Sequence, residues 1–284
     1  MSSTPLTAPP LAIGLAQSVY GERGNLELVV PNRDRGFRVL WCNGDDAESG
    51  GVPPRGWSAG LDVDTGGLVQ GVRIAQVPHG PSFLEASLLQ EGRAARWTWR
   101  PDLGFVPGGV IGPSTCTPSA IVAHDGRLHV LTAGDTEVVH HVARIESFPD
   151  LSWVIGGGIA AAGPVTSVDL VSRLGRLHAL VVSGGRALVH DLAAPEAAPA
   201  PIEGRLRTAM LTGSPLAAVG LDADGMLVGV GSPPTGPLDA VDAVLSSLDG
   251  GTLEVVALRG DELLHARTGR SGFAPIGRRG VLGA

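Results

Sequence analysis

Histidine and glutamate side chains recur at a fixed spacing along this chain of 284 residues. Two imidazoles that face one another across a pair of strands could bind one metal ion. A buried His–His or Glu–His pair could equally fix strand register through a hydrogen bond or an ion pair. No aspartate or cysteine completes a ligand set of recognisable spacing, so we expect structural pairs and no metal site. The pairs, 11 or 12 residues apart, are His129 with His140, His178 with His190, and Glu254 with His265.

A second group of side chains could bind a ring-shaped ligand. Trp97 and Trp99 alternate with Arg96 and Arg100, so in a β-strand the two indoles share one face and the two arginines share the other. Aromatic rings stack on ligand rings, and guanidinium groups donate hydrogen bonds to oxygen atoms. The competing interpretation is that each indole packs in the core.

Sequence motifs for covalent chemistry are missing. The chain has no G-x-S-x-G, no H-E-x-x-H and no G-x-x-x-x-G-K-[ST], and its glycine-rich segments follow strands without opening a helix. The fragments at 124–126 and 222–225 resemble parts of calcium loops but lack the further acidic ligands, which favours ordinary turns. We therefore assign no catalytic residue and no cofactor.

The composition limits the kinds of partner that this protein is expected to bind. The net charge is -7, the chain has no lysine, and its arginines are spread among a larger number of acids, so we expect no nucleic-acid partner. The first residues lack the features of a signal peptide, and no segment approaches the roughly 18 apolar residues of a membrane span. We expect a soluble, cytoplasmic, bacterial protein that does not bind membranes. Cys42 and Cys116 lack metal-ligand spacing and are expected to be buried free thiols.

All these side chains lie in a segment that repeats six times. Each repeat has a G-x-L-like strand, preceded by an apolar segment and followed by a third strand, and most repeats close on a glycine-rich segment with an aromatic residue. With 42 glycines and 22 prolines, the chain favours short strands over helices. The anchor leucines, separated by 58, 44, 49, 50 and 26 residues, are Leu26, Leu84, Leu128, Leu177, Leu227 and Leu253.

The repeats predict an all-β protein, a β-propeller of about six blades in a single domain spanning 1–284. The fifth blade should be truncated, because GSPPTGPLDAV replaces its hairpin turn. A β-solenoid or a pair of sandwiches is the alternative, although sandwiches have no reason to repeat a G-x-L signature. The expected blades cover approximately 11–67, 68–112, 113–161, 162–210, 211–240 and 241–284.

The clearest copy of the repeat is the hairpin at 125–142, DGRLHVLTAGDTEVVHHV. A two-residue turn at Gly134–Asp135 would place His129 opposite His140. Three-residue turns are expected at 32–34, 90–92 and 183–185, and the last of these would place His178 opposite His190.

The G-x-L-E-V pattern, followed about a dozen residues later by an aromatic/His-x-Trp unit and then a closing G-W segment, resembles the PLL-type bacterial lectin propellers, which are related in outline to fungal fucose lectins and tectonins. This resemblance extends over all six repeats. It implies sugar binding between neighbouring blades, with aromatic rings stacked on the sugar and Arg or Glu holding its hydroxyls. Later repeats replace the tryptophan, which implies one or two sites near blades one and two. The implied pocket residues are Glu27, Trp41, Glu85, Trp97 and Trp99, with Arg96 beside them.

We therefore predict a non-catalytic recognition protein that binds a carbohydrate or small molecule in an interblade pocket. Two other interpretations stay open. One is an enzyme, a hydrolase or a cyclase or isomerase acting on an apolar metabolite, with its site in the axial cavity. The other is a scaffold for protein partners. The sequence fixes neither the ligand nor the oligomeric state.

Overall fold

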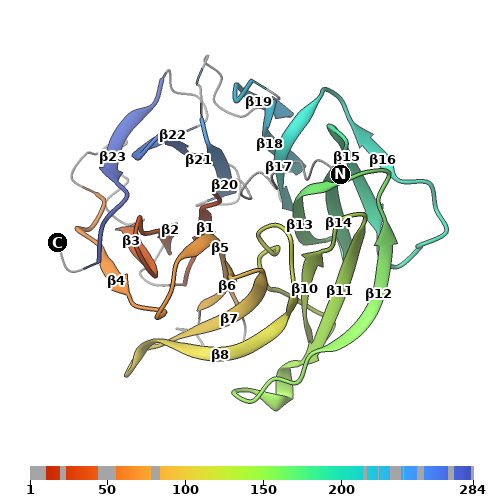
Figure 1. Ribbon diagram of the computed structural model, residues 1–284, viewed down its shortest axis with the longest axis horizontal. Helices are drawn as coiled ribbons and strands as arrows, with labels where there is room; N and C mark the ends of the chain where they lie inside the picture. Colours follow the sequence, from red (N-terminus) through yellow and green to blue (C-terminus); the bar gives the residue numbers. More distant parts are fainter. Residues whose placement is uncertain are drawn as a thin grey trace, which may run out of the picture.

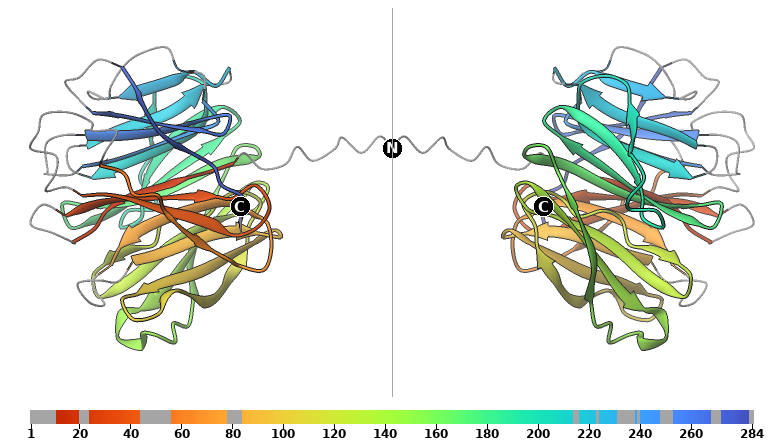
Figure 2. Two further views of the ribbon diagram at one scale, coloured as in Figure 1. Left: turned by 90° about the vertical axis from the view of Figure 1, so that its left-hand side faces the viewer. Right: turned by 90° about the vertical axis from the view of Figure 1, so that its right-hand side faces the viewer.

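The computed structural model forms a ring of six antiparallel sheets around a central axis (Figures 1 and 2). It describes residues 11–19, 24–43, 56–77, 84–213, 216–222, 224–230, 238, 240–247, 253–267 and 272–282. Five sheets have four strands, and within the described residues the fifth sheet in chain order has three. The predicted all-β propeller of about six blades is therefore confirmed. The segment at 231–241, on which the predicted truncation of the fifth blade rested, lies mostly outside the described residues, so that truncation stays a prediction.

Each blade is built from consecutive strands, with the first strand nearest the axis (Figure 1). Blade 1 has β1 (Gly14–Gln17), β2 (Asn25–Pro31), β3 (Phe37–Asn43) and β4 (Leu61–Val63). Blade 2 has β5 (Val69–Gln76), β6 (Leu84–Gln90), β7 (Arg93–Arg100) and β8 (Gly104–Pro113). Blade 3 has β9 (Val122–His124), β10 (Arg127–Ala133), β11 (Glu137–Arg144) and β12 (Val154–Ala160).

The second half of the ring follows the same order. Blade 4 has β13 (Val165–Arg173), β14 (Arg176–Ser183), β15 (Arg186–Asp191) and β16 (Ala200–Ile202). Blade 5 has β17 (Leu206–Gly213), β18 (Leu216–Asp222) and β19 (Leu227–Val230). Blade 6 has β20 (Asp242–Ser247), β21 (Leu253–Arg259), β22 (Glu262–Arg267) and β23 (Ala274–Arg278). In blade 5 the anchor Leu227 lies in the third strand rather than the second, because β17 already begins at Leu206.

The core lies between the blades rather than within them. Side chains alternate along each strand, so every second residue faces the preceding blade and the others face the next one. Phe37 of β3, for example, packs against Trp97 and Phe105 of blade 2. Similar apolar clusters lie between blades 2 and 3, between blades 3 and 4, and between blades 4 and 5. The largest cluster lies between blades 5, 6 and 1.

The hairpin turns differ from those expected, and the difference changes which residues face one another. The turn after β10 is made by Asp135 and Thr136, so His129 pairs with Val142 and not with His140. The shift is two residues, which leaves both histidines on one face of the sheet.

In blade 4 the turn has two residues instead of three. Gly184 and Gly185 both have positive φ, 55° and 77°, as a type I′ turn requires. His178 therefore pairs with Asp191, and His190 pairs with Ala179 on the opposite face. The predicted His178–His190 contact is wrong because a one-residue shift reverses the face of every later side chain.

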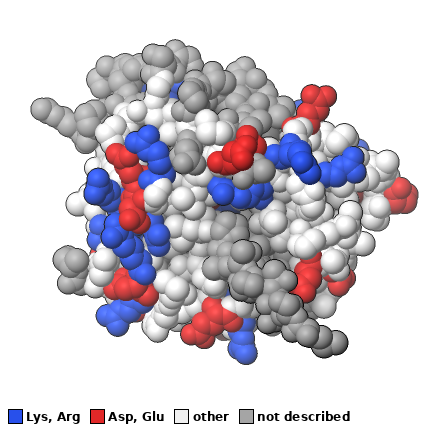
Figure 3. Space-filling view, turned by 45° about the horizontal axis from the view of Figure 1, so that its top comes forward, with Lys and Arg blue, Asp and Glu red and all other residues white. Residues whose placement is uncertain are grey.

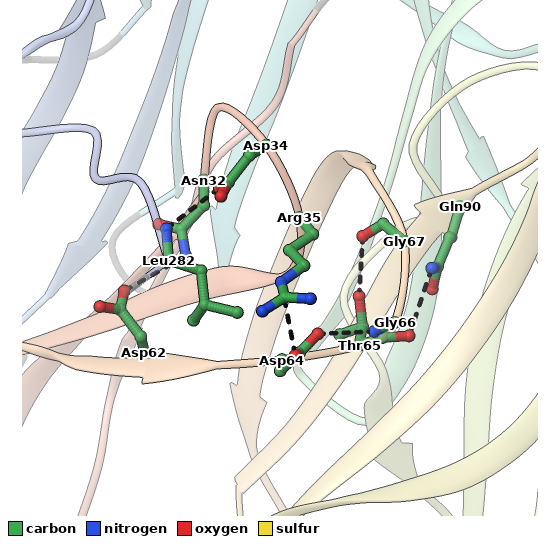
Figure 4. A network of polar contacts seen from close by, with 10 residues as sticks. All are labelled: Asn32, Asp34, Arg35, Asp62, Asp64, Thr65, Gly66, Gly67, Gln90 and Leu282. Carbon is green, nitrogen blue, oxygen red and sulfur yellow. Dashed lines mark hydrogen bonds and ion pairs between the residues drawn. The ribbon is translucent and has the colours of Figure 1, made fainter. Parts of the chain in front are cut away.

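The C-terminal segment after β23 closes the ring on blade 1. Arg279 donates to the carbonyl oxygens of Pro31 and Asn32 over 3.0 and 3.1 Å, and the Gly280 carbonyl accepts from Arg33 N at 3.0 Å. Figure 4 shows the neighbouring contacts, in which Leu282 N donates to Asp34 Oδ1 and the Asn32 amide donates to Asp62. Within the described residues each blade uses only consecutive strands, so these contacts take the place of a shared strand at the closure.

Charged side chains on the surface are largely paired. Figure 3 shows arginines and acids side by side along one edge of the face that it draws, and pairs such as Arg33–Asp261 at 2.6 Å and Arg35–Asp64 at 3.4 Å are exposed. The described part of the chain has no helix with the length and apolar character to span a membrane.

Candidate functional site

The structure divides the predicted pocket residues between two interfaces. Glu85 and Arg96 lie on the face of blade 2 that is turned toward blade 3, whereas Trp97 and Trp99 lie on the face turned toward blade 1. Strand alternation explains the division, because Arg96 and Trp97 are consecutive residues of β7. Glu85 pairs with Thr98 across the sheet, not with Trp97 as the expected turn would require.

Glu85 and Arg96 form a buried, bidentate ion pair. Arg96 donates from Nε and Nη2 to the two carboxylate oxygens of Glu85, both over 2.7 Å, and the Thr98 hydroxyl adds a third bond at 3.0 Å. The side chains of Glu85 and Arg96 are 0% and 1% exposed. Such a bidentate pair fixes the guanidinium in one orientation. Arg96 is therefore positioned in advance, before any ligand arrives.

A cavity of about 490 Å³ lies over this pair, between blades 2 and 3. One wall is β7 with Arg96, Thr98 and Arg100, and β8 contributes a second. The third wall is the β11–β12 connection at 148–152, where Arg96 donates from Nη1 to the Pro149 carbonyl over 3.1 Å. The Phe148 ring lies 5.6 Å from the guanidinium carbon, as in a cation–π contact. The cavity thus combines fixed donors, an aromatic ring and the carboxylate of Asp150.

The outer strand β8 makes room for the arginine by a β-bulge. Its pairing with β7 shifts at Arg96, which lies opposite Gly109, while Trp97 lies opposite Pro107. Gly108 is the extra residue, and a Cβ on it would lie 2.8 Å from Arg96 Nη1 and 2.9 Å from Arg96 Cγ. Only glycine lets the guanidinium lie against this backbone.

Blade 6 has a similar buried carboxylate with two donors at the same position. Glu254, which is 0% exposed, accepts from His265 Nε2 at 2.8 Å and from Arg267 Nε at 2.6 Å. Trp57 of blade 1 donates from Nε1 to His265 Nδ1 over 3.2 Å, so the imidazole carries its proton on Nε2. Glu254 pairs with Arg267 and not with His265 across the sheet, yet the predicted Glu254–His265 side-chain contact forms diagonally.

Trp153 follows the lining residue Ser152 and packs in the apolar cluster between blades 2 and 3. It precedes Val154, the partner of Val142, just as Trp57 is the bridge partner of Cys42, so the two tryptophans occupy equivalent places in their blades. Trp57 Nε1 has His265 as its acceptor, but the equivalent of His265 in blade 2 is Arg96, which has donors alone. Accordingly Trp153 Nε1 is buried without a hydrogen-bond partner among the described residues. Trp153 lies in the glycine-rich closing segment of its repeat, but nothing in that segment's sequence indicates a missing acceptor.

The other predicted residues, at the interface of blades 1 and 2, are mostly packed. Trp97 meets Phe37 edge to face at 6.2 Å, and Trp99 lies 5.5 Å from Phe105. Trp41 is 41% exposed and pairs with Glu27 across the sheet. Burial raises the pKa of Glu27 to about 7, although a hydrogen bond from Ser18 opposes this effect.

His129 and His140 form the expected structural pair. Their Nδ1 and Nε2 atoms are 2.9 Å apart, and the rings stack with centroids 5.1 Å apart. His129 Nε2 lies 3.2 Å from the His124 carbonyl and must donate to it, so Nδ1 accepts from His140. Among the residues that the structure describes, no group of three or more His, Cys, Asp or Glu side chains could hold a metal ion. Both cysteines are free and buried, as predicted.

No family model matches this sequence, and no curated protein matches it. Solved structures do resemble it. The fucose-specific lectin from Aleuria aurantia, a six-bladed β-propeller, is 12% identical with a TM-score of 0.52 over 95% of this chain and 79% of that one. AofleA from Arthrobotrys oligospora, solved as a mutant, is 10% identical with a TM-score of 0.62 over 94% and 85%. A chain of the nidogen–laminin complex is 12% identical with a TM-score of 0.50 over 78% and 76%.

At this identity the neighbours define the fold class, a six-bladed β-propeller, and nothing finer. The resemblance to PLL-type lectins and tectonins in particular stays a prediction.

Proposed function

We propose that this protein is a lectin-like propeller that binds a carbohydrate in the cavity between blades 2 and 3. The observation that carries the proposal is the buried Arg96, which is fixed by Glu85 and lies in the wall of the cavity beside Phe148. Sugars present closely spaced hydroxyls on one side and C–H groups on another, and this site offers fixed polar groups together with an aromatic ring.

The hydrogen-bonding capacity of the site supports this assignment. An arginine has five N–H donors, of which Glu85 uses two and the Pro149 carbonyl uses one, so two remain for a ligand. Arg100 and Asp150 also line the cavity and can respectively donate to and accept from hydroxyls.

The structural neighbours add support for carbohydrates as the ligand class. The Aleuria aurantia lectin is described as fucose-specific and has been solved with a fucoside-containing disaccharide. Fucosides are therefore the first probes to use. Among the described residues, the cavity that Arg73, Thr117 and Thr208 line at the axis measures about 10 Å³, far below the roughly 300 Å³ or more of a small-molecule site, so it adds no support for the enzyme alternative.

The experiment is a glycan array with the wild-type protein, followed by calorimetric titration of the best glycan. Arg100→Ala, which removes a guanidinium from the cavity wall, should weaken binding about tenfold, which corresponds to about 1.4 kcal/mol. Arg144→Ala, at an exposed arginine outside the cavity, is the matched control and should retain affinity. A wild-type protein that binds no glycan would overturn the proposal.

Trp99→Ala tests which interface is used. Trp99 packs toward blade 1, so this variant should still bind the glycan. If Trp99→Ala abolishes binding while Arg100→Ala does not, the site lies between blades 1 and 2 and the assignment to the cavity between blades 2 and 3 is wrong.

A further inference from the structure

The axis of the propeller contains a buried polar cluster that the proposed sugar site does not use. Arg73 of β5 and Asp242 of β20 are 4% and 0% exposed in their side chains and form an ion pair of 2.9 Å. Arg73 also donates to the Ile13 carbonyl of blade 1, and Ile13 N donates to Asp242 Oδ2 over 2.9 Å. The inner edges of blades 1, 2 and 6 are thus joined by direct contacts.

Blades 3 and 5 contribute hydroxyl groups to the same region. Thr117 and Thr208 are 7% and 6% exposed, and the Oγ1 atom of each is buried without a hydrogen-bond partner among the described residues. The threonine and serine of blade 4 between them are satisfied, since Thr166 donates to the Arg207 carbonyl over 2.7 Å and Ser167 donates to the Ala209 carbonyl over 3.3 Å. Two buried hydroxyls without partners carry a free-energy cost that a bound polar molecule would remove.

Both hydroxyls line one cavity of about 10 Å³, whose wall also includes Arg73 and Ser167. That volume corresponds to about one water molecule. A buried water usually makes about three hydrogen bonds, and Thr117, Thr208 and the Arg73 guanidinium supply three groups of suitable chemistry. The guanidinium in the wall disfavours a cation at this place, and the volume excludes a larger ligand.

We infer that the axis has a binding site for one water molecule, which bridges Thr117 of blade 3 and Thr208 of blade 5 across blade 4. This water site adds blades 3 and 5 to the polar cluster in which direct contacts join blades 1, 2 and 6. The site is a property of the axis and is independent of any sugar binding at the periphery.

A crystal structure of the full chain at about 1.5 Å tests the site. We expect one spherical density peak within about 2.7–3.2 Å of both Oγ1 atoms. A direct hydrogen bond between the two hydroxyls, with no peak, would overturn the inference. A soak in thallium acetate distinguishes water from a monovalent cation, and an anomalous peak at the site would also overturn it.

Solution stability provides a second test that does not depend on crystals. Thr117→Val and Thr208→Val each leave the other hydroxyl without its bridge, so each should raise the unfolding equilibrium constant about tenfold. The double variant removes both hydroxyls, so its increase in the unfolding equilibrium constant should be clearly smaller than the product of the two single increases. Thr136→Val, at an exposed threonine, controls for the substitution itself. If the increase in the double variant equals the product of the two single increases, the two hydroxyls do not share a water molecule and the inference is wrong.

Discussion

One structural position in the propeller has a buried polar group in several blades. The residue after the anchor leucine is Glu85 in blade 2, His129 in blade 3 and Glu254 in blade 6, and each of these is buried against the next blade. An unpaired polar group there would destabilise the fold, so each has acquired its own partners: Arg96, His140, and the His265–Arg267 pair. In blade 2 alone of these three does an open cavity of the described structure lie against the pair.

The histidine pair of blade 3 should make stability depend on pH. The pKa of His140 is lowered to about 4, mainly by burial and in addition by the positive charges that His129 and His141 would carry; burial also lowers the pKa of His129. These folded-state values lie below the unfolded value of about 6.5, so the unfolded chain binds more protons as the pH falls. The stabilising effect of the neutral pair is complete above about pH 6.5 and is lost between that pH and about 4.

We therefore expect His140→Gln to flatten the pH profile of the free energy of unfolding between pH 6.5 and 4.5, by roughly 2 kcal/mol. Urea titrations at four pH values across this range would measure it. The acids Asp169 and Glu27, whose pKa values burial raises to about 6 and about 7, act in the opposite direction in both proteins and cancel in the comparison. Parallel profiles for wild type and variant would contradict the assignment.

At the scale of single elements, glycines in the outer strands decide where the buried side chains can lie. Gly108 is the bulge residue opposite Arg96, and Gly156 occupies a similar irregularity opposite His140 and His141 in blade 3. A Cβ on Gly156 would lie 3.3 Å from His140 Nδ1. Bulges of this kind give one strand an extra residue and redirect the neighbouring side chains.

Gly108→Ala should therefore displace Arg96 from Glu85. We expect a loss of about 1–3 kcal/mol in the free energy of unfolding, as for other overpacked sites, together with a loss of glycan binding. Gly134→Ala is the matched control, because its nearest atom would lie 3.5 Å away and its φ is not positive. Chemical denaturation and titration calorimetry measure both effects, and equal behaviour of the two variants would show that Arg96 adjusts freely.

Turn length acts at the same scale and controls which side chains can meet. The pair Gly184–Gly185 could be assigned to a two-residue or a three-residue turn from composition, and the choice decides whether His190 faces blade 3 or blade 5. Glu91 and Gly92 both have positive φ and form the two-residue turn of blade 2. This turn length places Glu85 opposite Thr98.

For the whole molecule, the closure of the ring depends on a short tail. Arg279 donates to the carbonyl oxygens of Pro31 and Asn32, and it lies 3.6 Å from Asp261. Within the described residues no strand is shared between blades 1 and 6, so their contact depends on side-chain packing and on hydrogen bonds such as these and that of Ile13 N to Asp242.

Arg279→Ala should consequently lower the free energy of unfolding by about 1.5–3 kcal/mol, the range for hydrogen bonds to a charged group. The loss should appear as faster hydrogen exchange in β2, β3 and β23. Arg278→Ala, at the exposed neighbouring residue, should change stability by less than about 0.5 kcal/mol. Unchanged exchange at the closure in Arg279→Ala would show that the apolar cluster of blades 5, 6 and 1 suffices.

The sequence alone determined the architecture, because a repeating apolar pattern about 50 residues long has to bury its faces against copies of itself. It also identified Glu85 and Arg96 as polar residues of that repeat, and it indicated the histidine pair of blade 3. Tertiary structure decided which residues share a pocket. Strand alternation sends Arg96 and Trp97 to different blades, and the wall that carries Phe148 comes from the next repeat. Contacts between repeats are set by turn length, bulges and blade packing, none of which a single repeat records in its own residues.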